Sequence, residues 1–463
     1  MLAKIRDMDF YRKIPKDLTE TSAHGAALSL CATVFMLVLF IAELWAFLST
    51  NISTAVVIDP NTESLLRINF NITVLDMPCE YATIDVVDVL GTRSENVSLN
   101  INKWQVDAQG IRRNYEGRNL EQRELEHDTH HDLDLLHRNG VHAVPVDERS
   151  FEPWLEKYDY TMVNFYAPWC LWCQRLEPVW EAFAEKMTTD EMPVSVVKVD
   201  CVANRKLCLD QHIQAFPLVR MFKKGVVQPP DYRSDRTLEA FSEFVNQRLA
   251  KDEVLKSMAP HEREKHEEKS LEERDDHPGC MMSGFLLVNR VPGNFHVEMR
   301  SKNHNINPPG ANMSHVVNSL SFGPSISKSM ERKMKLIPDD YFSIENTRAM
   351  DDRFYINDKL HQAFHHYIKV VSTSIEVNKR YMGDNSVLAY QMVQSSQIMQ
   401  YTDEEIPEAR FAYDLSPMSV RITRTGKHWY EFLTSMCALI GGTFTVVGLL
   451  SSFLGTVFKP KKI

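Results

Sequence analysis

The chain lacks several features that would place it in common classes of protein. Its 52 Lys and Arg are outnumbered by 62 Asp and Glu, and the resulting formal net charge of −10 gives no reason to expect nucleic-acid binding. Cysteine is scarce, with 8 in 463 residues, and only one Cys-x-x-Cys pair is present. A structural zinc site normally needs a second ligand pair at similar spacing, so zinc is disfavoured. The chain is also too long for one domain.

Long apolar runs are absent except near the two ends. Residues 26–48 contain a single charged residue, Glu43, and residues 432–458 contain none. Both runs are long enough to cross a bilayer as helices. A cleaved signal peptide is the alternative for the first run, but the run is too long and the mostly polar residues 1–25 precede it. A buried core helix is the alternative for the second. We therefore expect one transmembrane helix at each end.

The charges beside the two runs predict an orientation. No Lys or Arg occurs in residues 49–66, whereas basic residues lie outside the runs at Lys4, Arg6, Arg12, Lys13, Lys16, Lys459, Lys461 and Lys462. The positive-inside rule then places both termini in the cytosol and the intervening chain in the lumen. Four Asn-x-Ser/Thr sequons between the runs agree with this topology and are candidate glycosylation sites: Asn51, Asn71, Asn96 and Asn312.

The Cys-x-x-Cys pair lies in the sequence Trp-Cys-Leu-Trp-Cys, after the apolar run 162–168. Cys170 and Cys173 are one helical turn apart where a strand is expected to pass into a helix. The helix N-terminus favours the thiolate of Cys170, and Cys173 is within reach to resolve a mixed disulfide. This pattern predicts thiol–disulfide exchange.

The remaining cysteines fit an oxidising compartment. Cys201 and Cys208 predict a local structural disulfide, with a second redox pair as the alternative. Cys79 and Cys280 are then left as a further candidate pair, flanking the redox region in the sequence. Cys31 and Cys437 lie inside the apolar runs and are expected to serve as small apolar residues.

The redox motif stands in an α/β pattern. Residues 194–200 and 218–222 are predicted strands, and residues 174–187 show helical spacing interrupted by Pro178, which is expected to kink that helix. The strings Tyr-Ala-Pro-Trp-Cys at 166–170, Lys-Val-Asp at 198–200 and Phe-Pro at 216–217 resemble a thioredoxin-fold domain of the protein disulfide isomerase family.

That resemblance implies roles for particular residues. Pro217 would be the cis-proline that faces the two cysteines, and Cys170 would be the exposed nucleophile. Arg236 matches the arginine that modulates the second cysteine. A solvated arginine at a helix start is the alternative for Arg236.

Departures from the family motif predict slow or specialised exchange. Leu171 and Trp172 separate the cysteines where Gly and His are common, and Gln174 replaces a lysine. The Cys170 thiolate thereby loses two positive neighbours. Asn164 stands where the family has a buried glutamate, and an amide cannot relay a proton.

The rest of the chain is rich in predicted strands. They fall on both sides of the redox region, at residues 54–58, 65–75, 83–89, 281–291, 295–299, 367–374, 388–395 and 417–423. We expect a β-sandwich assembled from both flanks. The charged stretches 112–138 and 251–277 are expected to be exposed helices or mobile linkers. His127, His130 and His131 are candidate metal ligands in the first of them, with a solvated linker as the favoured alternative.

A second resemblance covers the predicted sandwich. Residues 76–88, 284–293, 313–323 and 413–418 resemble the ERGIC family of cargo receptors, which cycle between ER and Golgi in coated vesicles. Cargo-receptor halves split by a thioredoxin domain are the layout of the PDI-C type (PDI-like 5-4) isomerases. The resemblance implies an α/β thioredoxin fold inserted into a mainly-β, sandwich-like lumenal ERGIC-type domain, anchored by a transmembrane helix at each end, and ER–Golgi traffic.

The expected domain layout follows from these two resemblances and the apolar runs. It comprises a cytosolic tail (1–25), a transmembrane helix (26–48), the first ERGIC-type part (49–112), a linker (113–140), the thioredoxin domain (141–250), a linker (251–277), the second ERGIC-type part (278–428), a transmembrane helix (432–458) and a cytosolic tail (459–463). The tail carries Lys459 and Lys461 in a K-x-K-x-x pattern, a dilysine signal that the COPI coat reads. An ordinary basic flank of a transmembrane helix is the alternative.

Two functions are consistent with the sequence. The first is a membrane-bound disulfide oxidoreductase or isomerase of the ER and the ER–Golgi intermediate compartment, acting on client proteins with thiols or disulfides. The second is a cargo or retrieval receptor that captures thiol-exposing clients with little turnover. Neither needs a cofactor or a metal. Expected partners are clients, COPI and COPII coat components at the tails, and ERGIC-family members in an oligomer.

Overall fold

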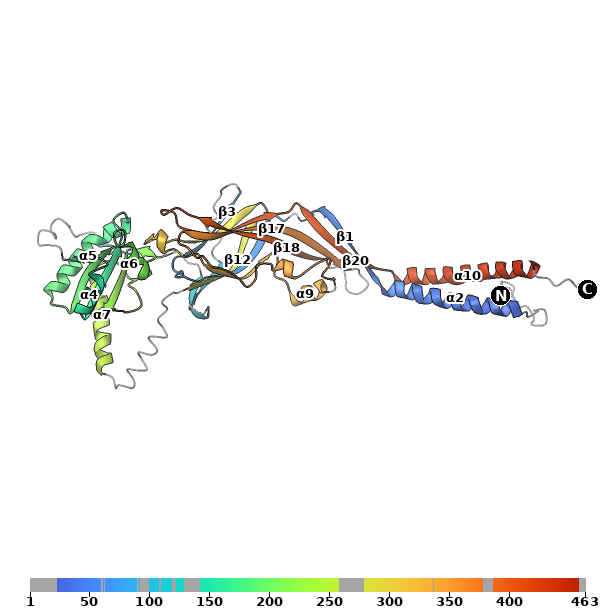
Figure 1. The fold of residues 1–463 in the computed structure, drawn as a ribbon, viewed down its shortest axis with the longest axis horizontal. Coiled ribbons are helices and arrows are strands. Elements are labelled where there is room, and N and C mark those ends of the chain that lie inside the picture. Colours follow the sequence, from blue (N-terminus) through green and yellow to red (C-terminus); the bar gives the residue numbers. More distant parts are fainter. Residues whose placement is uncertain are drawn as a thin grey trace, which may run out of the picture.

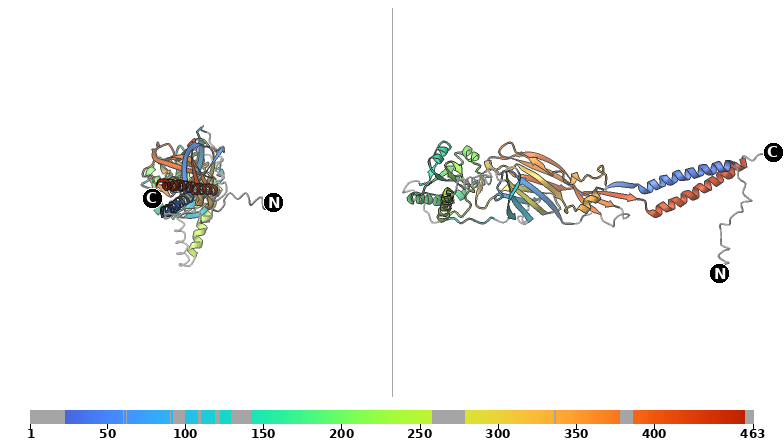
Figure 2. Two further views of the ribbon diagram at one scale, coloured as in Figure 1. Left: turned by 90° about the vertical axis from the view of Figure 1, so that its right-hand side faces the viewer. Right: turned by 90° about the horizontal axis from the view of Figure 1, so that it is seen from below.

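The computed structural model describes residues 23–59, 61, 63–89, 91, 100–107, 110–118, 122–128, 142–257, 279–335, 337–377 and 386–457. They form an elongated molecule with three parts in a row (Figure 1): a pair of long helices, a β-sandwich and an α/β domain. Figure 2 shows the same order in a perpendicular view. The expected fold class is confirmed.

The paired helices are α2 (Ala23–Leu48) and α10 (Trp429–Val457), and they run side by side in Figures 1 and 2. Leu30–Leu48 and Trp429–Leu450 are long and apolar enough to cross a membrane, which confirms the expectation of one such helix at each end. The single carboxylate of the first run has a partner, because Lys427 Nζ lies 2.7 Å from Glu43 Oε1.

The sandwich consists of two sheets built from both flanks of the α/β domain. The first sheet has the order β1 (Thr50–Ile58), β20 (Met418–Gly426), β17 (Gln362–Val377), β19 (Ala409–Leu415), β13 (Gly293–Met299) and β3 (Ala82–Asp88), and β18 (Val387–Gln400) also pairs with β17. The second has the order β16 (Arg353–Tyr355), β15 (His315–Phe322), β2 (Leu65–Val74), β12 (Gly279–Asn289), β4 (Ile101–Val106) and β5 (Arg112–Arg118). Both sheets bury alternate residues against one another, as Ile68, Phe70 and Ile72 of β2 illustrate.

Each of the eight predicted host strands corresponds to an observed strand, but several strands went unpredicted. The unpredicted strands in the described part of the host are β4, β5, β14 (Asn305–Ile306), β15, β16 and β19. Strand β5 corrects the expectation that residues 112–118 belong to a linker. It pairs with β4 alone and exposes most of its side chains, so an edge strand tolerates this charged sequence. The turn before it places Gly110 at φ +81°, a conformation that favours glycine.

The α/β domain has a five-stranded sheet between helices. Its order is β11 (Val226–Val227), β10 (Leu218–Lys223), β7 (Tyr160–Tyr166), β8 (Val194–Asp200) and β6 (Val144–Pro145), with β6, β7 and β8 parallel. The helices are α4 (Phe151–Lys157), α5 (Leu171–Thr189), α6 (Arg205–Asp210) and α7 (Leu238–Ser257). Pro178 lies inside α5, and Trp180, Phe183 and Phe241 fill the core between α5 and α7.

Short elements complete the fold. Strand β9 (Ala215–Phe216) of the α/β domain pairs with β14 (Asn305–Ile306), which belongs to the sandwich part of the chain. The 3-10 turns η3 (Pro308–Gly310) and η4 (Glu345–Thr347) and helix α9 (Lys328–Met334) lie in the same part. Strand β14 thus joins the two domains through main-chain hydrogen bonds.

Candidate active site

The two motif cysteines stand where β7 passes into α5. Cys170 is the N-cap residue of α5, and its Sγ accepts a hydrogen bond from the Cys173 N–H at 3.1 Å. The two residues are joined as a disulfide with a Cα–Cα distance of 5.2 Å. After reduction, the same N–H and the positive end of the helix would stabilise a thiolate on Cys170.

Pro217 directly follows Phe216, a residue that packs with this disulfide. The Phe216–Pro217 peptide bond is cis, and Pro217 is buried. Phe216 belongs to the same apolar cluster as Cys170 and Cys173, and its ring meets that of Trp169 edge to face at 6.1 Å. The structure therefore brings together Cys170, Cys173 and the residue that precedes Pro217.

The expectation that Cys170 is exposed is wrong for this structure. Cys170 has an exposed fraction of 0%, and that of Cys173 is 4%. The main chain of Phe216 is covered by β14. Trp172, in the motif itself, stacks on His127 with ring centroids 5.3 Å apart and planes at 19°. Segments outside the thioredoxin domain therefore contact Phe216 and Trp172, two neighbours of the buried cysteines.

Arg236 is buried rather than solvated, with 4% of its surface exposed, which overturns the alternative of a solvated arginine. Burial lowers the pKa of its guanidinium to about 10. Its N–H donates to the Glu126 carbonyl at 2.8 Å, and its Nη1 has no hydrogen-bond partner in the described part of the chain. The segment containing Glu126 thereby contacts Arg236 directly.

Asn164 is buried on β7, and its Oδ1 has no partner among the described residues. It faces Lys198 of β8 in the strand register. Lys198 Nζ lies 2.8 Å from Glu181 Oε1, and Glu181 is fully buried on α5. Burial alone would raise the pKa of Glu181, but hydrogen bonds from the Ala143 N–H and from Lys198 outweigh it and hold that pKa below its usual value.

This buried charge pair was missed by the sequence reasoning. A lysine in the middle of the predicted buried strand 194–200 is a signal that an anion lies nearby, because a buried ammonium group needs a partner. The sequence did not identify Glu181 as the partner of Lys198, since Glu181 is on the apolar side of a helix that also carries exposed acidic residues.

The structure places the other cysteines in two further disulfides. Cys201 and Cys208 are joined with a Cα–Cα distance of 5.6 Å, closing the turn between β8 and α6. Cys79 and Cys280 are joined with a Cα–Cα distance of 4.9 Å. Among the described cysteines, Cys31 of α2 and Cys437 of α10 are free.

Three of the four sequons lie in the described part of the chain. Asn51 of β1 is exposed. Asn71 of β2 is half-buried and accepts from Asn318 Nδ2 at 3.2 Å, and Asn312 Oδ1 accepts from the Ser314 N–H at 3.0 Å. The predicted sites that fall outside the described residues are Asn96, His130, His131, Lys459 and Lys461.

Possible metal ligands are few within the described residues. Neither ring nitrogen of His127 has a hydrogen-bond partner there, and burial together with Arg236 and Arg175 lowers its pKa to about 4. In the sandwich, Asp85, His296 and Glu298 each offer a ligand atom within 4.8 Å of one another. Arg300 Nη1 lies 3.2 Å from Asp85, so positive charge is already supplied to that group.

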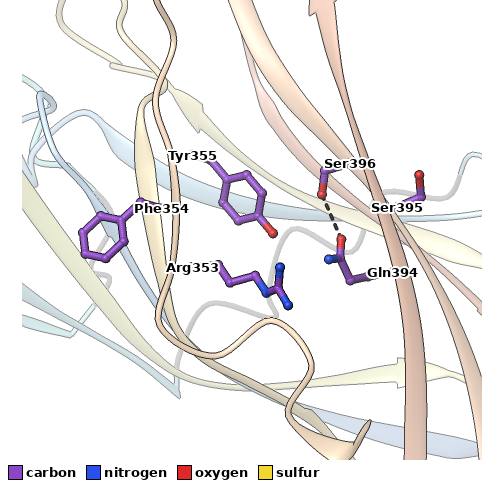
Figure 3. Close-up of a pocket in the computed structure, with 6 residues that line it drawn as sticks. All are labelled: Arg353, Phe354, Tyr355, Gln394, Ser395 and Ser396. Carbon is purple, nitrogen blue, oxygen red and sulfur yellow. Dashed lines mark hydrogen bonds between the residues drawn. The ribbon is translucent and has the colours of Figure 1, made fainter. Parts of the chain in front are cut away.

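Two cavities lie outside the disulfide itself. One, of about 1600 Å³, lies between the sandwich and the α/β domain and is lined by residues of both, among them Pro217, Tyr232 and His304. The other, of about 480 Å³, is on the sandwich between β16 and β18. Figure 3 shows Arg353 and Tyr355 on one side of it and the hydrogen-bonded Gln394 and Ser396 on the other.

Three family models match the chain. The thioredoxin model matches residues 142–247, the Endoplasmic Reticulum-Golgi Intermediate Compartment (ERGIC) model matches residues 5–95, and the endoplasmic reticulum vesicle transporter model matches residues 243–451. Both resemblances inferred from the motifs are thus confirmed.

Relatives match the chain over nearly all of its length. Protein disulfide-isomerase 5-4 of Arabidopsis thaliana is 34% identical over 98% of this chain and 96% of its own length. The probable endoplasmic reticulum-Golgi intermediate compartment protein 3 of Dictyostelium discoideum is 24% identical over 98% of this chain and 95% of its own. The crystal structure of Erv41p aligns with 80% of this chain and 99% of its own at a TM-score of 0.34 and 14% identity. The chain belongs to the family of the protein disulfide-isomerases 5-3 and 5-4, in which a thioredoxin domain interrupts ERGIC-type sequence.

Proposed function

We propose that the chain is a membrane-bound thiol–disulfide oxidoreductase that exchanges disulfides with client proteins through Cys170 and Cys173. The observation that carries this proposal is the position of Cys170 as the N-cap of α5, with the Cys173 N–H directed at its sulfur. Phe216 belongs to the same cluster as the two cysteines, and Pro217, joined to it by a cis peptide bond, would orient a client segment against the sulfur.

The exchange proceeds in two thiol–disulfide exchange steps. The Cys170 thiolate attacks one sulfur of a client disulfide, forming a mixed disulfide and releasing a client thiolate. The Cys173 thiolate then attacks Cys170 Sγ, which forms the Cys170–Cys173 disulfide and releases the second client thiolate. The client is reduced by two electrons and the protein is oxidised by two. The reverse sequence oxidises a client dithiol, and both directions together isomerise disulfides. Arg236 is buried and pairs with His127, whose ring stacks on Trp172 of the motif; by the family resemblance it would modulate the pKa of Cys173.

The proposed location is the membrane of the ER and the ER–Golgi intermediate compartment. The ERGIC-type sequence and the two apolar helices support it. The basic residues outside the helices favour cytosolic termini and a lumenal sandwich and thioredoxin domain. Lys459 and Lys461 would be read by the COPI coat in the cytosol, and COPII components would load the protein forward. ERGIC-family members are the proposed oligomeric partners.

A second candidate function is capture of thiol-exposing clients for retrieval, with little turnover. Asn164 supports it, because no carboxylate stands at that buried position to take the Cys173 proton, and the nearby Lys198 is engaged by Glu181. A mixed disulfide on Cys170 would then persist. The ERGIC-type parts would supply transport of the captured client.

Trapping separates the two functions. Cys173→Ser in the full chain, expressed in cells, is expected to hold clients on Cys170, whereas Cys170→Ser/Cys173→Ser holds none. Oxidoreductase function predicts that the unaltered chain releases the same clients rapidly unless a thiol-alkylating reagent is added to quench the exchange. Capture predicts mixed disulfides of comparable abundance in the unaltered chain and in Cys173→Ser. Absence of any Cys170-linked client in Cys173→Ser would contradict both.

A further inference from the structure

The main-chain edge beside Pro217 is occupied by the chain's own sandwich part. In the antiparallel pairing of β9 with β14, Phe216 faces Asn305 and Ala215 faces Ile306. The Asn307 N–H donates to the Gln214 carbonyl at 2.8 Å. A free strand edge next to a reactive disulfide is where an extended client segment would pair, because main-chain hydrogen bonds hold any sequence in register. Strand β14 takes that place here.

The sandwich surface around β14 fits this edge closely. Asn307 Nδ2 donates to the Ile213 carbonyl at 2.7 Å. A Cβ on Gly310 would lie 2.7 Å from the same carbonyl, so glycine permits the approach. From the other side, Gln214 Nε2 donates to the Asp76 carbonyl at 3.0 Å. The chain from residue 213 to 216 is therefore covered along its length.

A second segment covers the motif from another direction; we name residues 122–128 the strap. Its sandwich end is held by Asn303, whose side chain donates to the Arg123 carbonyl at 2.7 Å and accepts from the Leu125 N–H at 3.1 Å. Its other end is held by the thioredoxin domain, because the Arg236 N–H donates to the Glu126 carbonyl at 2.8 Å, and Arg123 Nη2 also lies 2.6 Å from Asp235 Oδ1. At that end, the His127 ring stacks on Trp172.

Together these contacts close the site. Cys170 has no exposed surface, and it packs in one cluster with Phe216 and Trp172. Because β14 pairs with Phe216 and the strap stacks on Trp172, displacing them would open an approach to the Cys170 sulfur along these two residues. The contacts that hold the closed arrangement are chiefly hydrogen bonds and an exposed ion pair, which exchange readily with water.

We propose that β14 and the strap act as an internal competitor of clients: they occupy the strand edge at Ala215–Phe216 and cover Trp172, and an extended client segment binds by displacing them. This inference rests on the proposed exchange function. It adds that the sandwich regulates access to the disulfide, and that a client is recognised as an extended segment pairing with β9.

The first test measures access to the Cys170 thiol. Asn307→Ala with His127→Ala removes the side-chain amide on Ile213 and the ring on Trp172, and neither residue touches the motif cysteines covalently or by hydrogen bond in the described structure. Asn69→Ala is the matched control, since Asn69 bonds Ser321 and Gly323 within the sandwich. With the full chain in detergent micelles and the Cys170–Cys173 pair selectively reduced, alkylation of Cys170 is expected to be at least tenfold faster in the double variant than in the control. Equal rates would overturn the inference.

The second test uses no substitution in β14 or in the strap. In Cys173→Ser, a synthetic peptide with one activated cysteine is coupled to Cys170, and hydrogen exchange is measured by mass spectrometry. Segments containing Ala215, Phe216, Asn305 and Asn307 exchange slowly in the uncoupled protein if β14 is docked. Coupling is expected to speed exchange in residues 305–307 while residues 215–216 stay protected by the peptide. Continued protection of residues 305–307 would overturn the inference.

Insulin reduction by the same proteins separates this inference from the proposed function. If no variant reduces insulin, the proposed disulfide-exchange function is contradicted. The alkylation and hydrogen-exchange results still decide whether β14 and the strap close the site. If the double variant, the control and the unaltered chain all reduce insulin at the same rate, the proposed function is supported and the inference that β14 and the strap compete with clients is overturned.

Discussion

At the scale of single residues, the sequence predicted which residues form the redox motif, but it did not predict which of them are buried. The spacing of Cys170 and Cys173 sufficed to find the disulfide, and the resemblance to a thioredoxin-fold domain sufficed to find the cis-proline. The burial of Cys170 and Arg236 was not predictable, since the covering residues come from segments distant in the sequence.

Asn164 offers a direct test of the chemistry. Asn164→Glu places a carboxyl group at the buried β7 position that faces Lys198, and this group would accept the Cys173 proton. Mixed disulfides on Cys170 are expected to resolve about a hundredfold faster, which is the lower end of the range for general acid–base catalysis. Quenched-flow gel analysis of the mixed disulfide measures the rate. Asn246→Glu on the exposed side of α7 is the control and should leave it unchanged. A variant as slow as the unaltered chain would show that proton removal from Cys173 does not limit resolution.

A buried histidine pair predicts a pH dependence of stability. His315 Nε2 and His366 Nε2 are 3.0 Å apart in the sandwich core, and both residues have no exposed surface. Burial lowers the pKa of both histidines, and the charges of His315 and His365 lower the pKa of His366 further. Below about pH 6.5 the unfolded chain therefore binds more protons than the folded one, and the free energy of unfolding falls by about 1.4 kcal/mol per pH unit for each histidine.

Thermal unfolding of the sandwich between pH 7.5 and 5 measures this effect. In His315→Leu/His366→Leu the decline with falling pH should be shallower, although the starting stability is lower. Ser396 keeps a partner in that variant, because its hydroxyl also donates to Gln394. An equal slope in both proteins would mean that other groups cause the acid sensitivity.

At the scale of elements, alternation of apolar and polar residues located strands but not their neighbours. The predicted strand 65–75 is β2, whose partners β12 and β15 lie more than a domain away in the sequence. Strand β5 escaped prediction because an edge strand needs no apolar face, and β4 because its alternation is broken by the buried Lys103. Lys103 is held by the carbonyls of Cys79 and Ala82, at 3.2 and 2.6 Å.

The pairing of β12 with β4 depends on one glycine. A Cβ at Gly284 would lie 2.2 Å from the Asn100 carbonyl oxygen, a backbone atom that cannot turn aside. Gly284→Ala is expected to push β4 from β12 and to destabilise the sandwich by about 1–3 kcal/mol, as overpacking does. Ser283→Ala, at the preceding position of β12, is the control. Urea unfolding followed by tryptophan fluorescence reports the difference through Trp104 of β4. A loss of less than 0.5 kcal/mol, roughly the spread of neutral surface changes, would contradict the close approach.

At the scale of the whole molecule, the layout of a thioredoxin domain between two ERGIC-type parts was predictable from motif order. The docking of the two domains was not, because its contacts are polar and carry no hydrophobic period in the sequence. Figure 1 shows the outcome: the thioredoxin domain lies at the end of the sandwich opposite the paired helices. The redox site therefore stands away from the membrane that α2 and α10 would cross.

The proposed topology has a simple test. Protease added outside sealed microsomes is expected to remove only short terminal segments, because the sandwich and the thioredoxin domain lie between the two spans. Epitope tags at the two ends report the cytosolic side, and an antibody to residues 151–189 reports the lumenal side. Permeabilised microsomes serve as the control for protease activity. Digestion of residues 151–189 in intact vesicles would place this domain in the cytosol.

The Cys79–Cys280 disulfide also bears on how the protein withstands damage. It joins residues 201 positions apart and encloses the inserted domain together with strands β3, β4 and β5 of the sandwich. A single proteolytic nick anywhere between them leaves both membrane-anchored halves covalently linked. On a gel the nicked protein is expected to migrate as one species without reductant and as two fragments with it. Even complete excision of the thioredoxin domain would leave the two ends of the sandwich joined to each other through this disulfide.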